Sequence, residues 1–193
     1  MANPARRASV DEYLAIEASS DAKHEYLNGE IVAMAGASPR HNVIASNVTG
    51  VLRNALERSP YRVLGSDQRV RIESTGAYVY PDVSVVCSEP RFGVDRPVSL
   101  LNPSLVIEVL SPSTEDHDRG AKLAHYRRLA SIQEVLLIEP NERRAELYSR
   151  LENGTWLITD VVAGAVELES VGAQLALDEI YSKTEGLPLD DAG

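Results

Sequence analysis

The stretch Leu105-Val106-Ile107-Glu108-Val109-Leu110 places one carboxylate inside an otherwise uninterrupted apolar run. A run that is apolar on both faces is typical of a central strand that is buried on both sides of a sheet. A carboxylate buried there without a partner would be strongly destabilising. We therefore expect Glu108 to be protonated, paired with a base or bound to a metal ion. Alternation along the strand places Glu108 on the same face as Val106 and Leu110.

A second apolar run, Asp82-Val83-Ser84-Val85-Val86-Cys87, begins with an aspartate that follows Pro81. If the two runs pair antiparallel through the connection at residues 88–104, the head of one meets the tail of the other and Asp82 lies near Glu108. Two close carboxylates repel each other unless a cation lies between them. A few oxygen ligands, without a histidine or cysteine cluster, suit Mg²⁺ or Mn²⁺ better than Zn²⁺. The sequence therefore predicts a divalent-metal site at Asp82 and Glu108.

Lys122 is the third candidate, because it falls on the apolar side of a helix predicted over residues 114–130. At about 100° per residue, its stripe also holds Leu123, Tyr126, Leu129 and Ala130, and the opposite side holds Ala121, Ala124, His125, Arg127 and Arg128. A lysine that points towards the sheet needs an anionic partner, and Glu108 is the obvious one. A metal-free ion pair of Glu108 with Lys122, with Asp82 only closing a turn, would explain the same residues. Tyr126 either orients Lys122 or packs in the core.

The remaining pattern predicts an α+β or mixed α/β fold, with a mixed sheet flanked by helices and hairpins at both ends. Ser9 and Glu12 fit a capping box, and Asn28-Gly29 is a strong hairpin signal. Apolar periodicity supplies the other elements. The predicted strands are residues 24–27, 30–34, 62–73, 77–87, 105–110, 134–139, 144–149 and 155–162, and the predicted helices are residues 10–17, 41–58 and 114–130.

The composition is that of an acidic globular protein, and its 193 residues fit one domain over residues 1–193. The balance of 19 Lys and Arg against 29 Asp and Glu argues against a non-specific nucleic-acid binder, although a nucleic-acid enzyme with a local basic groove remains possible. The single cysteine, Cys87, is expected to be a buried structural thiol. Without a membrane-spanning or secretory segment, we expect a cytoplasmic protein. The proline-rich connection at residues 88–104 is either a functional lid or partner loop, or an ordered surface loop.

Three blocks of sequence, in this order, resemble the Uma-type restriction endonuclease family, a branch of the PD-(D/E)XK nuclease superfamily. They are Tyr80-Pro81-Asp82, the run from Ile107 to Thr114, and the run from Asp118 to Arg128. The resemblance extends over a core of about residues 9–187, and it implies a restriction-endonuclease-like fold. It also implies metal-dependent phosphodiester hydrolysis with Mg²⁺ or Mn²⁺, a DNA substrate and a homodimer.

The resemblance implies that Asp82 and Glu108 are metal ligands and that Lys122 is the catalytic amine. The superfamily lysine is expected two residues after the glutamate, where this chain has Leu110. In the family that this chain resembles, that lysine has moved onto the following helix. Glu30 and Gln68 are weaker additions to the site, and Glu30 is equally well explained as a solvent-facing hairpin residue.

Two classes of function remain open on the sequence. The intact acid–acid–lysine set favours an endonuclease or a related phosphodiesterase. The acidic net charge and the lack of an obvious DNA-reading segment keep open a non-catalytic nucleic-acid-binding or accessory module that retains the nuclease fold. His41 and His125 are expected at the surface or at helix ends rather than as ligands.

Overall fold

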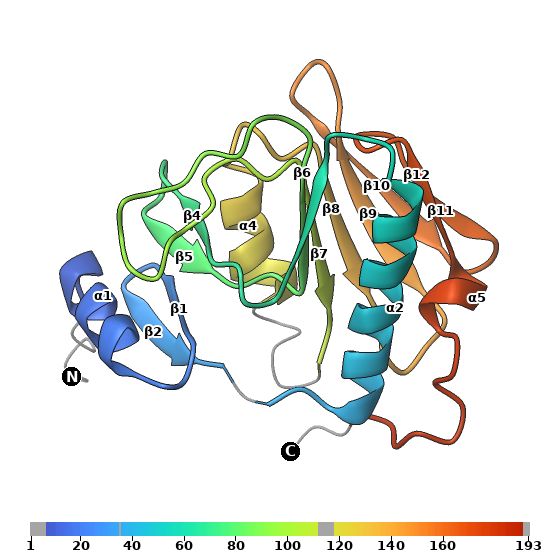
Figure 1. The fold of residues 1–193 in the computed structure, drawn as a ribbon, viewed down its shortest axis with the longest axis horizontal. Helices are drawn as coiled ribbons and strands as arrows, with labels where there is room; N and C mark the ends of the chain where they lie inside the picture. The colour runs from blue at the N-terminus through green and yellow to red at the C-terminus, as the bar shows by residue number, and fades with distance from the viewer. Residues whose placement is uncertain (1–6, 35, 112–117, 191–193) are drawn as a thin grey trace, which may run out of the picture.

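The computed structural model describes residues 7–34, 36–111 and 118–190, and the strands in these ranges form three sheets (Figure 1). The strands are β1 (His24–Leu27), β2 (Glu30–Ala33), β3 (Arg62–Gly65), β4 (Val70–Ile72), β5 (Ala77–Val79), β6 (Val83–Val86), β7 (Leu105–Val109), β8 (Glu134–Ile138), β9 (Ala145–Arg150), β10 (Trp156–Val161), β11 (Ala165–Leu168) and β12 (Ala173–Ala176). The largest sheet has the order β10-β9-β8-β7-β6-β3, the second has the order β2-β1-β5-β4, and β11 pairs with β12. This mixed α+β architecture confirms the predicted fold class.

The helices cover the large sheet on both faces. Helix α2 (Pro39–Ala55) crosses the front of the sheet in Figure 1, and its apolar side shares one core with β11, β12 and α5 (Leu177–Ile180). On the other face, α4 (Leu123–Tyr126) and strands β4 and β5 enclose a second core. A small tyrosine cluster lies between α1 (Val10–Ser19) and the second sheet.

Strand β7 is the central buried strand that the sequence predicts. All five of its residues are buried, and it lies between β6 and β8 in the large sheet. It pairs antiparallel with β6, with Val83 opposite Ile107. Val106 and Leu110 pack in the core on the α4 side, so the predicted face of Glu108 is confirmed.

The local signals at the start of the chain are also confirmed. The side chain of Ser9 accepts a hydrogen bond from the backbone of Glu12, and the side chain of Glu12 accepts one from the backbone of Ser9. These reciprocal bonds satisfy two of the free N–H groups at the start of α1. Asn28 and Gly29 have φ angles of 53° and 86°, as a two-residue turn between β1 and β2 requires.

Two strands predicted as continuous are each divided between the two larger sheets. Residues 62–73 form β3 and β4, because a turn at residues 66–68 redirects the chain after Gly65. Residues 77–87 form β5 and β6, separated at Pro81. Proline has no N–H to donate to a strand ladder, so the chain leaves one sheet before Pro81 and enters the other after it. This break places Asp82 at the head of β6.

The predicted helix over residues 114–130 is shorter and less regular than expected. Its described part is a wider π-helical turn, η1 (Asp118–Lys122), followed by α4, which ends at Tyr126; residues 112–117 lie outside the described residues. The guanidinium of Arg150 donates hydrogen bonds to the carbonyls of residues 127, 129 and 132, and these bonds satisfy the carbonyls where the helix stops.

The predicted helical stripe is correct for its central members and wrong at two positions. Leu123, Tyr126 and Leu129 are buried together with Lys122. Ala130 is exposed, and His125 is buried with its Nδ1 2.8 Å from Oγ1 of Thr75. A uniform rotation of 100° per residue does not apply to a segment that begins as a π-helical turn and ends early.

Within the described ranges, none of the helices has the length and apolar character needed to cross a membrane.

Candidate active site

The ammonium of Lys122 lies among three carboxylates that come from three different elements. Its Nζ is 2.8 Å from Oε1 of Glu108 on β7, 3.1 Å from Oε1 of Glu25 on β1 and 3.2 Å from Oδ1 of Asp118 on η1. The side chains of Lys122 and Glu108 are each only 4% exposed. The predicted contact between Lys122 and Glu108 is therefore present, and the lysine holds two further acidic groups.

Glu108 is surrounded by more negative than positive charge. Burial raises the pKa of Glu108, the nearby Lys122 lowers it, and the carboxylates of Asp118, Asp82 and Glu25 raise it again, so that the net pKa lies well above the ordinary value. The hydroxyl of Tyr126 donates a hydrogen bond of 2.5 Å to Oε1 of Glu108. Tyr126 therefore contacts the acid rather than serving only as core packing.

Asp82 is adjacent to Glu108 across the β6–β7 pair. The register of β6 and β7 brings the head of β6 to the carboxyl end of β7, and the backbone N–H of Val109 donates to Oδ2 of Asp82 at 2.8 Å. The Nε2 atom of His41, near the start of α2, is 3.2 Å from the same oxygen. Burial lowers the pKa of His41, but the hydrogen bond and the charge of Asp82, together with the charge of Asp190, outweigh it and raise the net pKa.

The first hairpin contributes Glu25 to this site rather than Glu30. Glu25 is buried, and its Oε1 accepts a hydrogen bond of 2.8 Å from the backbone N–H of Tyr80 as well as contacting Lys122. Glu30 lies on β2 and is exposed, which fits the solvent-facing alternative. Strand alternation in the sequence indicates that Glu25 is buried, because residues 25 and 27 lie on the same face of a strand and Leu27 is apolar.

The remaining candidates lie outside the acid–lysine cluster. The amide of Gln68 donates to the backbone carbonyls of Arg69 and Val98, so it joins a turn to the long connection. Cys87 is partly buried, with its Sγ 3.6 Å from the carbonyl oxygen of Ser170, and burial raises its pKa. Both features fit a structural thiol. His41 lies near the start of α2, as expected for a residue at a helix end, and its ring also contacts Asp82.

The donor set fits a hard divalent cation. Asp82, Glu108, Glu25 and Asp118 bring four carboxylates to one region that contains one lysine. Mg²⁺ and Mn²⁺ prefer oxygen ligands, and Mg²⁺ is commonly held by one or two carboxylates plus substrate phosphates. In the described part of the chain, no three His, Cys, Asp or Glu side chains are grouped so that they could hold a metal ion. The fit therefore rests on a two-carboxylate site at Asp82 and Glu108.

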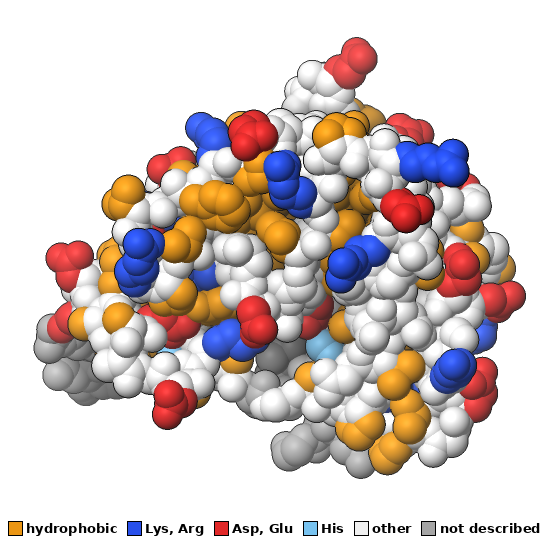
Figure 2. Space-filling model, in the orientation of Figure 1, with side chains coloured by type: hydrophobic (Ala, Val, Ile, Leu, Met, Phe, Trp, Pro, Cys, Tyr) orange, Lys and Arg blue, Asp and Glu red, His pale blue; other side chains and the backbone are white. Residues whose placement is uncertain are grey.

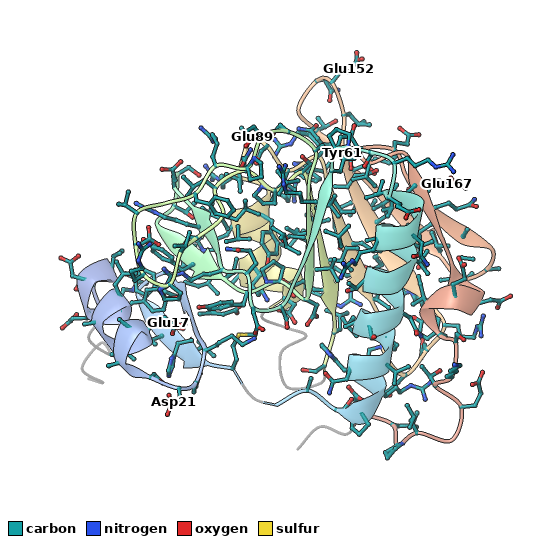
Figure 3. All side chains as sticks on the ribbon, viewed as in Figure 1. Glu17, Asp21, Tyr61, Glu89, Glu152 and Glu167 are labelled. Carbon is teal, nitrogen blue, oxygen red and sulfur yellow. The ribbon has the colours of Figure 1, made fainter. Side chains whose placement is uncertain are left out.

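The face of the molecule shown in Figure 2 carries both positive and negative side chains. On the face shown in Figure 2, blue and red side chains are interspersed, and the coloured residues form no continuous basic band. Figure 3 shows Glu152 at the tip of the turn between β9 and β10, and Glu167 at the outer edge near β11. Both of these acidic side chains lie at the periphery of the molecule in this view.

The fold and the carboxylate–lysine cluster define a restriction-endonuclease-like α+β protein. A family model described as "Uma2: Putative restriction endonuclease" matches residues 10–178, and the chain belongs to this Uma2 family. The uncharacterized protein slr1290 of Synechocystis is 39% identical over 181 residues, covering 92% of this chain and 93% of that protein. The uncharacterized protein sll1609 of the same organism is 36% identical over 158 residues, covering 82% and 89%.

A solved structure shares the fold. The crystal structure of "a putative nuclease belonging to DUF820 from Anabaena variabilis" aligns with a TM-score of 0.72, covering 90% of this chain and 97% of that chain. At 20% sequence identity this likeness establishes the architecture.

Proposed function

We propose that this chain is a metal-dependent nuclease that hydrolyses phosphodiester bonds in DNA, with residues 1–193 acting as one catalytic domain. The observation that carries the proposal is the convergence of Glu108, Glu25 and Asp118 on the buried amine of Lys122, with Asp82 beside them. Membership of the Uma2 family supports the nuclease class.

Each residue has a distinct role in this proposal. Asp82 and Glu108 would hold Mg²⁺ or Mn²⁺, which when bound polarises a phosphate oxygen and lowers the pKa of a water molecule. Lys122 orients the attacking water or offsets the negative charge that develops on the phosphate. Glu25 and Asp118 hold the lysine in place, since each lies within 3.2 Å of its Nζ.

The direct test is a cleavage assay on single-stranded, duplex and branched DNA with Mg²⁺ or Mn²⁺. We expect the wild-type protein to cut at least one of these substrates, and Asp82→Asn to lose at least a hundredfold in rate. Asp160→Asn is the matched control, because it makes the same chemical change on β10, where Asp160 pairs with Arg144. Equal activity of Asp82→Asn and wild type would refute the assignment of Asp82.

Metal binding can be tested without any substrate. If Asp82 and Glu108 share an ion, millimolar Mn²⁺ should raise the melting temperature by mass action. At a Mn²⁺ concentration of a hundred times the Kd, the free energy of unfolding should increase by about 2.7 kcal/mol. Asp82→Asn should remove most of this gain. A wild-type protein whose melting temperature is indifferent to both Mg²⁺ and Mn²⁺ would contradict a metal site.

A second candidate function is a non-catalytic nucleic-acid-binding or accessory module. Two observations favour it: Lys122 and Glu108 are almost fully buried in mutual ion pairs, and the coloured face in Figure 2 carries no continuous basic band. Such a module would give no cleavage of any of these DNA substrates with either metal. The same assay therefore separates the two functions.

We infer further that the protein acts as a cytoplasmic homodimer. Many nucleases cut two strands with two sites, and the long connection at residues 88–104 supplies exposed apolar side chains, Phe92 and Val94 among them. Sedimentation velocity at micromolar concentration should show a dimer. A sedimentation profile with monomer alone would exclude this assembly.

A further inference from the structure

The carboxylate of Asp82 is held by two donors that come from two different elements, β7 and α2. One donor is the backbone N–H of Val109 at the end of β7, at 2.8 Å, and the other is the His41 ring on α2, at 3.2 Å. Both donors contact the same oxygen of Asp82, Oδ2. This arrangement fixes the carboxylate plane and leaves Oδ1 as the oxygen that can bind a cation.

The backbone of His41 is fixed by the capped start of α2. Ser38 is the N-cap of α2, and its Oγ accepts a hydrogen bond of 3.0 Å from the backbone N–H of His41. Ser38 is anchored in turn by a hydrogen bond to the carboxylate of Asp190. The side chains of His41 and Asp82 are only 12% and 14% exposed. A capped helix start, rather than a loose loop, therefore presents the ring to Asp82.

We propose that His41 is a positioning residue which, by donating from Nε2 to Oδ2, directs Oδ1 of Asp82 towards a divalent cation. The inference rests on the proposed metal-dependent function and adds a partner that the metal ligand requires. Groups that hydrogen-bond to metal ligands fix their orientation, and their loss typically costs about 10–100-fold in metal affinity or activity.

His41 acts through Asp82 and is not itself a ligand in this proposal. Its Nε2 atom lies at hydrogen-bond distance from a carboxylate oxygen, so that nitrogen carries the proton and has no lone pair for a metal. The other two histidine rings in the described residues make different contacts: His125 bonds to Thr75, and His24 bonds to Glu17. Figure 3 shows Glu17 on the α1 side of the molecule, away from the start of α2.

The test compares three substitutions of His41 by Mn²⁺ titration of the full-length protein, with free Mn²⁺ followed by electron paramagnetic resonance. His41→Phe keeps a flat ring without a donor, and His41→Asn is polar but too short to reach Oδ2. His41→Gln places an amide N–H near the position of Nε2. The matched control is His125→Phe, which removes a buried ring that contacts Thr75 instead.

We expect His41→Phe and His41→Asn to weaken the Kd for Mn²⁺ about 10–100-fold, while His41→Gln and His125→Phe stay within about threefold of wild type. Thermal unfolding in EDTA checks that each variant is folded, and either His41→Phe or His41→Asn suffices if the other does not fold. Wild-type Mn²⁺ affinity in a folded His41→Phe or His41→Asn protein would overturn the role of His41 alone. The absence of Mn²⁺ binding by the wild-type protein would overturn the proposed function and this inference together. Equal weakening in His41→Gln would also overturn the inference, because the ring would then matter only for packing.

Discussion

Two buried cations in this protein have opposite surroundings, and the difference separates a structural network from a candidate catalytic one. Arg69 is fully buried between the second sheet and the long connection. Lys122 is buried where β1, β7 and η1 meet. Both ions satisfy the rule that a buried charge needs partners, but only one of them lies among an excess of opposite charge.

The Arg69 network is balanced. Its guanidinium donates to Oδ2 of Asp95 and Oγ of Ser99, each at 2.8 Å, and to the carbonyl of Pro97. Burial raises the pKa of Asp95, but hydrogen bonds from Ser99 and the backbone, with the charges of Arg69 and Arg71, outweigh it and leave the pKa below the ordinary value. The network therefore fastens the residue 88–104 connection to the body of the protein, as the ordered-loop alternative requires.

Among the residues that the structure describes, the Lys122 network brings more carboxylates than ammonium groups together. One ammonium faces Glu108, Glu25 and Asp118, with Asp82 nearby, and the pKa of Glu108 lies well above its ordinary value. A buried carboxyl group whose pKa is strongly raised by burial and by neighbouring charges is typical of functional sites. An excess of acid is unfavourable in an empty site and favourable once a divalent cation binds.

The largest expected effect comes from removing each cation. Arg69→Met and Lys122→Met should each destabilise the metal-free protein by about 3–5 kcal/mol, because each removes a buried positive charge that pairs with buried carboxylates. Mn²⁺ should restore much of the stability of Lys122→Met and none of that of Arg69→Met, because only the Lys122 site has carboxylates in excess. Chemical denaturation with EDTA or with Mn²⁺ measures both effects. An equal gain in stability of the two variants with Mn²⁺ would contradict the claim that only the Lys122 network binds a divalent cation.

Cleavage provides a second comparison at Lys122. Lys122→Ala should abolish cleavage, and Leu110→Lys added to it should recover part of the activity, because Leu110 shares a buried strand face with Glu108. Recovery should be partial, since a misplacement of about 1 Å can cost on the order of 10²-fold. Folding is checked by circular dichroism. Full activity in Lys122→Ala would make the lysine structural.

The two networks should also respond to pH with opposite signs. The pKa of Asp95 is lowered on folding, so its stabilisation is present above its ordinary value of 3.8 and is lost as the pH falls through the lower folded pKa. Asp95→Asn should therefore be less stable than wild type by about 1–3 kcal/mol at pH 7, with a smaller difference at pH 3. The pKa of Glu108 is raised, so in EDTA its ionisation costs stability as the pH rises above 4.5.

It follows that Glu108→Gln, which cannot ionise, should gain stability relative to the metal-free wild type between pH 4.5 and 7. Urea unfolding at several pH values measures both differences. If the stability difference from wild type changed with pH in the same direction for Asp95→Asn and Glu108→Gln, the charge of Glu108 would be as well neutralised by its surroundings as that of Asp95.

Much of the site could be predicted because its signals are local anomalies in strong patterns. A glutamate inside an apolar strand and an aspartate at the head of another are visible at once, and antiparallel pairing of β6 with β7 brings them together. Lys122 is predictable because it interrupts the apolar stripe of a helix. In each case the cost of burying a charge makes the position conspicuous.

The parts that were missed depend on contacts between distant segments. Glu25 approaches Lys122 only because the second sheet packs beside the large one, and His41 meets Asp82 only because α2 packs against the large sheet. The division of residues 77–87 into β5 and β6 was missed because the apolar pattern continues across Pro81. Apolar periodicity reports burial, but it does not report which sheet a strand joins.

The smallest expected effect compares two phenols, one in each network. Tyr126 donates to Oε1 of Glu108 at 2.5 Å, whereas the hydroxyl of Tyr13 accepts from Arg69 at 3.3 Å and donates to the carbonyl of His24 at 2.9 Å. Each Tyr→Phe change removes hydrogen bonds worth about 1 kcal/mol and keeps the ring. Tyr126→Phe should weaken the Kd for Mn²⁺ about fivefold, which corresponds to about 1 kcal/mol, because Glu108 loses one of the two groups that hold Oε1. Tyr13→Phe should lower stability by a similar free energy without changing Mn²⁺ affinity. Mn²⁺ titration and denaturant unfolding of both variants decide the point, and equal Mn²⁺ affinity in the two would show that Tyr126 only packs the core beside Glu108.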